Sequence, residues 1–196
     1  MHEITAVNPG QLKGISTKTN DIHHGKLYTG YVNKRNEIEK LVGELGSSDL
    51  DAGNQTYSKI RGIKEGETFA ANGMVLHERY FSNLGGDGQA KGKLFDDIVK
   101  QWGTYEAFVA MFTACGMAAR GWAILAYDWS DRKLHIYTAD AQNHGGVWGT
   151  TPLIPLDVYA HAYFLDFGAD RKAYIAAFLS NLNWDEINAH YSKIVQ

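Results

Sequence analysis

Histidines are the residues in this sequence most able to do chemistry, and the chain has eight of them. Their neighbours single out a subset. His23 and Tyr31 are eight residues apart in a predicted helix, so they share one face two turns apart. Asp157 and His161 follow a strand-like run and are separated by three residues. Imidazoles combined with a carboxylate form a mixed nitrogen and oxygen site that suits iron, manganese or zinc. The residue types alone do not choose among these metals, and they do not show that the side chains converge.

His77 has a glycine, Gly73, one helical turn before it. Glycine inside a helix costs about 1 kcal/mol relative to alanine, so it indicates a packing or functional reason. Gly73 leaves the helix surface beside the imidazole bare. A metal ligand at His77 is therefore consistent with its surroundings, as is a structural histidine.

Other catalytic chemistries have weaker support. The HERY segment at 77–80 lacks the second histidine of a zinc protease motif, and no nucleophile elbow is present. The glycine-rich run at 85–92 lacks the spacing of a phosphate-binding loop. A zinc hydrolase also needs a positioned general base, and the sequence offers no candidate. Cys115, in a run of small apolar residues, is interpreted as an inert buried thiol.

The elements that would position these residues follow from hydrophobic spacing. Apolar residues three and four apart predict a helix from Asn20 to Leu45, with a cap at residues 19–21. The polar stretch 46–55 predicts a loop, and a second helix is expected over about 68–84. Two long helices joined by a polar turn indicate an antiparallel hairpin. The run GGDGQAKG at 85–92 is interpreted as a linker and domain boundary.

The second half alternates between helical and strand patterns. Two helices are expected in LFDDIVKQWG and TYEAFVAMFTACGMAARG, and two more in 170–183 and 184–194. Residues 121–128 and 133–140 predict a β-hairpin around the turn WSDR, with a third strand at 151–157. The predicted fold class is α+β: an N-terminal antiparallel helical hairpin over 1–86, followed by an α/β domain with a three-stranded antiparallel sheet over 87–196.

Composition excludes several functional classes. The 196 residues are 44% hydrophobic and 21% charged with a net charge of −3, typical of a globular protein. This charge balance does not indicate nucleic-acid binding, and no cluster of lysine and arginine in the sequence suggests binding to an anionic membrane surface. Cys115 is the only cysteine, which excludes an intrachain disulfide. Because no signal peptide is recognisable, we expect a cytoplasmic protein.

Four segments resemble the iron/manganese superoxide dismutases, in the order and with the spacing of that family. The run beginning DVYAHAYF at 157 is similar to the family's C-terminal signature, D-x-W-E-H-A-Y-Y. HHGKLYTGYVNKRN at 23–36 resembles the first metal-binding helix, and HERY at 77–80 resembles the second. GW at 121–122 matches an active-site tryptophan. The resemblance covers the chain from about residue 16 onward.

The resemblance implies one metal ion per chain, held by four protein ligands: His23, His77, Asp157 and His161. Tyr31 falls at the family's gateway tyrosine, and Gln142 at the glutamine that binds the solvent ligand of the metal. Trp122, Tyr80 and Tyr163 fall on the aromatic lining, and Arg171 matches an arginine near the site. The implied enzyme is a superoxide dismutase that converts superoxide to oxygen and hydrogen peroxide.

The resemblance also bears on which metal is used. Iron-type members supply the glutamine one turn before the second ligand, where this chain has Gly73. Manganese-type members supply it from about fifteen residues before the aspartate ligand, where this chain has Gln142. The cofactor is therefore expected to be manganese or iron, with manganese favoured.

Departures from the family pattern concern the subunit contact. Leu27 and Ala160 replace a histidine and a glutamate that meet the partner subunit, and Leu27 would leave Tyr163 without its partner. We therefore expect a monomer, or a weak or non-standard homodimer. The same changes keep open an alternative function, a metal-binding relative with a structural or redox-sensing role and little dismutase activity.

Overall fold

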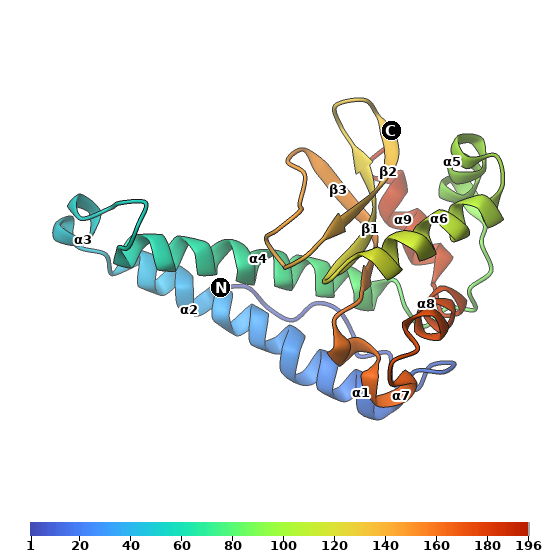
Figure 1. Cartoon of the computed structure of the whole chain (residues 1–196), viewed down its shortest axis with the longest axis horizontal. Coiled ribbons are helices and arrows are strands. Elements are labelled where there is room, and N and C mark those ends of the chain that lie inside the picture. The colour runs from blue at the N-terminus through green and yellow to red at the C-terminus, as the bar shows by residue number, and fades with distance from the viewer. Residues whose placement is uncertain (196) are drawn as a thin grey trace.

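The computed structural model describes residues 1–195, and its N-terminal half is a long antiparallel helical hairpin (Figure 1). An irregular segment leads into α1 (Thr17–Ile22), a π-helix (His23–Tyr28) and α2 (Thr29–Gly43). Ser16 is the N-cap of α1, because its hydroxyl accepts a hydrogen bond from the amide of Thr19. The predicted cap at 19–21 is therefore wrong, whereas the predicted helix is present as a continuous helical run over 17–43 that contains one π-helical segment.

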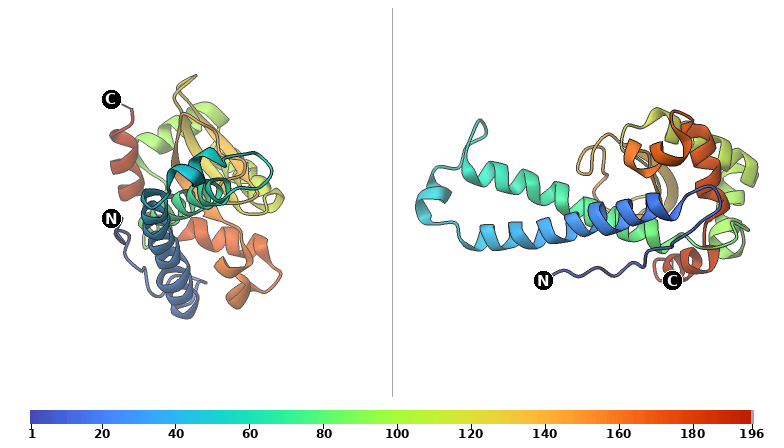
Figure 2. Two further views of the ribbon diagram at one scale, coloured as in Figure 1. Left: turned by 90° about the vertical axis from the view of Figure 1, so that its left-hand side faces the viewer. Right: turned by 90° about the horizontal axis from the view of Figure 1, so that it is seen from below.

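The second arm of the hairpin is α4 (Lys59–Ser82), capped by Ser58. It begins nine residues before the predicted start. The added residues are mostly polar, glycine or exposed, and Ile60 and Ile63 are the only apolar side chains among them, so the helical signal there is weak. The predicted loop contains a short helix, α3 (Ser47–Asp51), at the far end of the hairpin. In the views of Figure 2 the N-terminal segment runs alongside the hairpin.

The C-terminal half places helices around a three-stranded sheet. Helices α5 (Gly92–Trp102) and α6 (Tyr105–Ala118) precede β1 (Trp122–Asp128), β2 (Lys133–Ala139) and β3 (Thr150–Asp157). The sheet is antiparallel with the order β2-β1-β3. A 3-10 helix (Ala160–Ala162), α7 (Phe164–Phe167), α8 (Arg171–Ser180) and α9 (Trp184–Ser192) complete the described chain. The α+β fold class and the predicted sheet are confirmed.

The sheet explains where the core lies. All seven residues of β1 are buried, as expected for a central strand. β3 carries Pro152 and Pro155, which suit an edge strand because proline cannot donate to the ladder. Helix α6 packs against β1 and β2, whereas α4 and α9 pack against β3. The contact between α4 and β3 brings the two halves of the chain together.

The predicted linker is packed against the C-terminal half. The amides of Gly86 and Gly88 donate to the carbonyls of Asn181 and Leu182. A Cβ atom added to Gly88 would lie 2.6 Å from the carbonyl oxygen of Ser180, so this approach requires glycine. The segment thus fixes one half against the other. None of the described helices is long and apolar enough to cross a bilayer.

Candidate metal centre

Four side chains from four different elements converge between the two halves of the molecule. His23 opens the π-helix, His77 lies in α4, Asp157 ends β3 and His161 lies in the 3-10 helix. Each contributes one ligand atom to a group within which all atoms lie within 4.8 Å of one another. The structure therefore brings together all four residues named as ligands from the resemblance.

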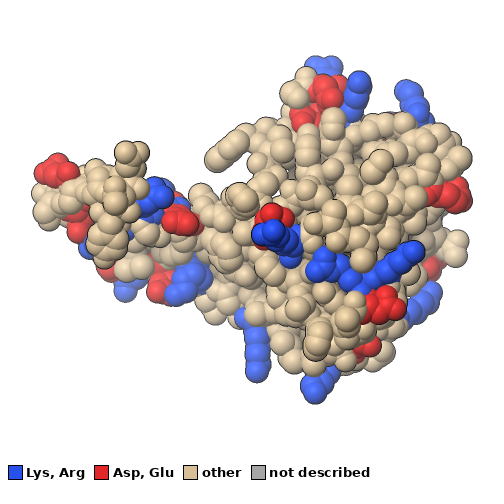
Figure 3. Space-filling model, in the orientation of Figure 1, with Lys and Arg blue, Asp and Glu red and all other residues tan. Residues whose placement is uncertain are grey.

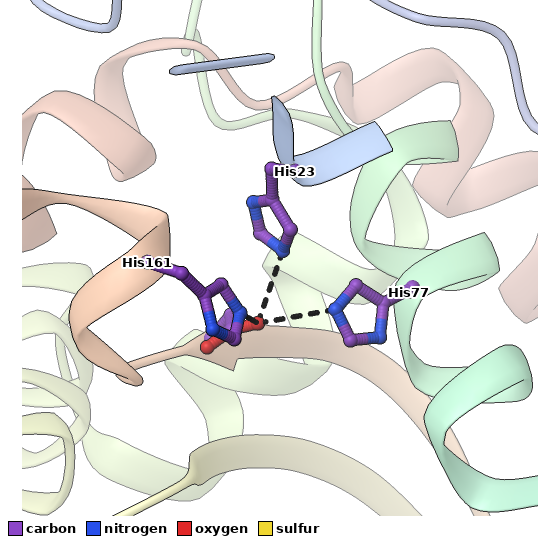
Figure 4. A group of neighbouring side chains, drawn as sticks. His23, His77 and His161 are labelled. Atoms are coloured by element: carbon purple, nitrogen blue, oxygen red, sulfur yellow. Dashed lines mark hydrogen bonds and ion pairs between the residues drawn. The ribbon is translucent and has the colours of Figure 1, made fainter. Parts of the chain in front are cut away.

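The geometry of the group is centred on one oxygen of Asp157. Its Oδ2 lies 3.0 Å from Nε2 of His161, 3.1 Å from Nε2 of His23 and 3.4 Å from Nε2 of His77. Figure 4 shows the three imidazole rings pointing at this oxygen from three directions. The side chains of His23, His77 and Asp157 are fully buried, and that of His161 is 26% exposed.

His77 provides the test of whether a cation fits here. Its Nδ1 lies 2.6 Å from the carbonyl oxygen of Gly73, which can only accept, so Nδ1 carries the proton. Burial lowers the pKa of His77 to about 3, with a further contribution from His23, so the ring is neutral at pH 7. Nε2 is then a bare lone pair, buried and without a hydrogen-bond partner, facing a carboxylate oxygen. Two acceptors that face each other in a buried site fit a cation between them.

The pKa values of Asp157 and His161 reflect both burial and their mutual contact. Burial alone would raise the pKa of Asp157, but His161 and His23 outweigh it and lower the pKa well below its usual range. Burial is also the largest influence on His161, yet the Asp157 carboxylate raises the pKa of that imidazole. The amide of Tyr159 donates to Oδ1 of Asp157 at 2.9 Å and thereby orients the carboxylate. The donor set suits iron, manganese or zinc.

Tyr31 and Gln142 lie beside the group and are joined in a hydrogen-bonded chain. The indole of Trp122 donates to Oε1 of Gln142 at 2.8 Å, and Nε2 of Gln142 donates to the hydroxyl of Tyr31 at 3.1 Å. Because an indole can only donate, it fixes which end of the Gln142 amide faces Tyr31. The ring of Tyr31 lies 5.1 Å from that of His77, and burial raises the pKa of its hydroxyl.

Gly73 explains how Tyr31 reaches this position. A Cβ atom added to Gly73 would lie 2.5 Å from Cδ1 of Tyr31, closer than two carbon atoms can approach. The tyrosine ring therefore occupies the space that any side chain at residue 73 would need. This glycine has the packing reason that the sequence predicted.

The aromatic surroundings match the expectation in part. Tyr80 and Trp122 pack on the imidazoles of His23 and His77, with ring centroids 5.0 and 5.1 Å apart. The ring of Tyr163 is stacked on Tyr174, and its hydroxyl accepts from Arg171. Phe81 is a further ring neighbour of His23, with ring centroids 4.9 Å apart. The sequence did not point to Tyr174, whose hydroxyl donates to the Asp157 carbonyl at 2.7 Å, because no spacing rule links them.

A second group of possible ligands lies at the β1–β2 turn and consists of Asp128, Asp131 and His135. Asp128 accepts hydrogen bonds from Ser130 and Tyr137, and Asp131 contacts His135 at 3.0 Å. These side chains satisfy one another, unlike the unpartnered Nε2 of His77. We interpret this group as a turn-stabilising network.

Comparison with known proteins agrees with this geometry. Residues 3–85 match the alpha-hairpin domain of iron/manganese superoxide dismutases, and residues 90–190 match their C-terminal domain. An iron superoxide dismutase of Aquifex pyrophilus is 38% identical over 97% of this chain and 90% of its own length. A manganese superoxide dismutase of Haloferax volcanii is 32% identical over 100% of this chain and 94% of its own. An iron superoxide dismutase of Cupriavidus metallidurans is 34% identical over 96% of this chain and 94% of its own length. The chain belongs to the iron/manganese superoxide dismutase family.

Proposed function

We propose that the superoxide dismutase activity of this chain resides at His23, His77, Asp157 and His161, which together hold one iron or manganese ion. The observation that carries the assignment is the buried, unpartnered Nε2 of His77 opposite the Asp157 carboxylate. When bound, the ion supplies one-electron redox chemistry, so that two superoxide anions and two protons become oxygen and hydrogen peroxide.

The chain's own residues would manage the protons. Because the Tyr31 hydroxyl accepts from Gln142, its own hydrogen is free to be donated towards the imidazole group. The raised pKa keeps this hydroxyl protonated at pH 7, so Tyr31 is a proton source. Gln142, held by Trp122 and 3% exposed, fixes the tyrosine oxygen. Tyr31 also lines a groove of about 640 Å³ between α2 and α4, which supports a route for superoxide past this residue.

We favour manganese over iron for the bound ion. The side-chain amide beside the site comes from Gln142, in the loop after β2, and Gly73 leaves no room for one from α4. This is the arrangement that the resemblance associates with manganese. Relatives carrying either metal in their names are similar to the chain, so direct measurement of the metal decides the choice.

The alternative of a metal-binding relative with little activity has less support. The ligand group is complete, and the chain from Trp122 through Gln142 to Tyr31 is intact. The changes that motivated the alternative, Leu27 and Ala160, lie outside the ligand group. We extend the proposal to a monomer or weak homodimer, because Ala160 is exposed and Tyr163 finds its partner, Arg171, within the chain. A cytoplasmic location stays a prediction.

Metal analysis tests the assignment. The protein is expressed with equal manganese and iron, dialysed against chelator and analysed for metal and for superoxide consumption. We expect about one ion per chain, with manganese in excess of iron, and little zinc. His77→Ala should lose the ion under the same dialysis, whereas His135→Ala, which alters the second histidine-containing group, should retain it. Full occupancy in the His77→Ala protein would show that the ligand assignment is wrong.

A further inference from the structure

A basic hollow lies on the C-terminal half, away from the imidazole group. It has a volume of about 470 Å³ and is formed by α5, the β1–β2 hairpin and the end of α9. An adjoining hollow of about 590 Å³ shares several of its residues and adds Trp129. In Figure 1 this region is the hairpin tip beside the C-terminal end, and Figure 3 shows Lys and Arg side chains there.

The charge of the hollow is unbalanced. Among residues 1–195, four cationic side chains line it, Lys93, Lys100, Arg132 and Lys133, and Asp97 is the one carboxylate. Asp97 is already occupied, because it pairs with Lys93 at 3.1 Å and accepts from the Tyr191 hydroxyl. Within residues 1–195, no carboxylate forms an ion pair with the other three cations. In a chain of net charge −3, this concentration of positive charge favours an anion.

Arg132 has a backbone conformation that supports a role for its side chain. Its φ is +59°, and it is the one residue other than glycine with positive φ in the described part of the chain. The position closes the WSDR turn, where the Arg132 amide donates to the Asp128 carbonyl at 2.9 Å. Glycine takes this conformation without steric cost, whereas other residues are uncommon there. Strained residues of this kind concentrate at functional sites.

Trp129 adds an aromatic surface in the adjoining hollow, which also contains Lys93 and Arg132. Its indole is 51% exposed, yet it is held by a hydrogen bond to Thr151 at 3.0 Å and by edge contact with the Tyr127 ring. A fixed, half-exposed indole is a stacking platform for a planar ring. The volume of the hollow is in the range of small-molecule sites. A ligand that carries both phosphates and a planar ring would satisfy both features.

We propose that this hollow binds a nucleoside phosphate, with the phosphates on Arg132, Lys133 and Lys100 and the base on Trp129. The site is separate from the dismutase centre, so its occupancy is measured by binding alone. Calorimetric titration of the metal-loaded protein with ATP, adenosine and inorganic triphosphate tests it. We expect ATP to bind more tightly than either fragment, because only ATP engages both the cations and the indole.

Substitutions separate this site from nonspecific charge. Arg132→Gly removes one cation at a position that favours glycine, so folding is preserved and ATP affinity should fall by at least about tenfold. Lys18→Ala removes an equal charge from an exposed residue of α1 and should leave affinity unchanged. Trp129→Leu should bring the affinity for ATP down to that for triphosphate.

Four results would overturn the proposal. The first is no ATP binding at millimolar concentration, and the second is equally strong ATP binding by Arg132→Gly and the wild-type chain. The third is equal affinity for triphosphate and ATP, which would leave no role for the indole, and the fourth concerns a polymer. A single-stranded oligonucleotide that binds far more tightly than ATP would assign the surface to a polymer instead. Dismutase activity should be unchanged in all of these variants.

Discussion

At the scale of single residues, the proposed centre depends on hydrogen bonds that leave lone pairs aimed at one point. The Gly73 carbonyl fixes the His77 tautomer, and the Tyr159 amide orients Asp157. Such supporting contacts typically change metal affinity or activity about 10–100-fold. His23 is less completely supported, because its Nδ1 has no hydrogen-bond partner. The individual contacts lead to two predictions.

Gln142→Ala should retain the metal but lower the rate of superoxide consumption. The substitution removes the amide that joins Trp122 to Tyr31 and leaves the four ligands in place. We expect a loss of about 10–100-fold in rate and a shifted midpoint potential, measured by pulse radiolysis and redox titration. Gln55→Ala, which removes an exposed glutamine amide outside the site, is the matched control. An unchanged rate and potential for Gln142→Ala would exclude the proposed role.

Gly73→Ala should displace Tyr31 and lower activity while the metal stays bound. The added Cβ would lie 2.5 Å from the tyrosine ring, and such overpacking costs about 1–3 kcal/mol of stability. Gly62→Ala in the same helix meets nothing within 4 Å, so it should instead stabilise the protein by up to about 1 kcal/mol. Thermal unfolding and activity of the pair separate the two effects. Equal thermal stability and equal activity of the Gly73→Ala and Gly62→Ala proteins would contradict the close contact between Gly73 and Tyr31.

At the scale of elements, the β1–β2 hairpin is held by the carboxylate of Asp128. It accepts from the Ser130 amide and hydroxyl at 2.8 and 2.6 Å and from the Tyr137 hydroxyl at 2.7 Å. The Ser130 hydroxyl, the Tyr137 hydroxyl and the Ser130 amide lower the pKa of Asp128 to about 2. The turn therefore depends on an ionised side chain.

Asp128→Asn should reduce stability at pH 7 but make little difference at acid pH. An unfolded aspartate has a pKa of about 3.9, so the native carboxylate stabilises the protein fully above that pH. The contribution is lost as pH falls from about 4 to about 2. Urea unfolding of the wild-type and Asp128→Asn proteins at pH 7, 4 and 2.5 measures the difference between their free energies of unfolding. Loss of metal at acid pH affects both proteins alike and therefore cancels in this difference. Asp51→Asn at an exposed position is the control. A stability difference between wild type and Asp128→Asn that does not change with pH would contradict the stabilising role of the Asp128 charge.

At the scale of the whole molecule, two halves of the chain share one centre. His23 and His77 come from the hairpin, and Asp157 and His161 from the C-terminal half. We propose residues 1–86 and 87–196 as the two domains, a division supported by family matches that end at 85 and begin at 90. The amide of Asn83 donates to the Leu153 carbonyl at 2.6 Å across this boundary. The site therefore requires both halves.

The wild-type chain should sediment as a monomer, or as a dimer that dissociates on dilution through the micromolar range. Ala160 presents no polar group to a partner, while Phe164 and Leu165 beside it are 60% and 54% exposed and favour weak association. Leu27→His combined with Ala160→Glu should strengthen the dimer and the retention of metal. A wild-type dimer that persists at nanomolar concentration would show that the prediction is wrong.

The sequence by itself determined the α+β class, the hairpin around WSDR and, through its resemblance to a family, the four residues that we propose as ligands. These features depend on local periodicity, turn chemistry and short motifs, which a linear pattern records. It failed at the π-helix, at the start of α4 and at α3, where polar and glycine residues outnumber apolar ones and weaken the periodic signal. Only the tertiary structure decided that Gly73 makes room for Tyr31, that Arg171 satisfies Tyr163, and that four dispersed cations surround one hollow. Each of these depends on contacts between residues far apart in the chain, and packing in three dimensions fixes such contacts where sequence spacing does not.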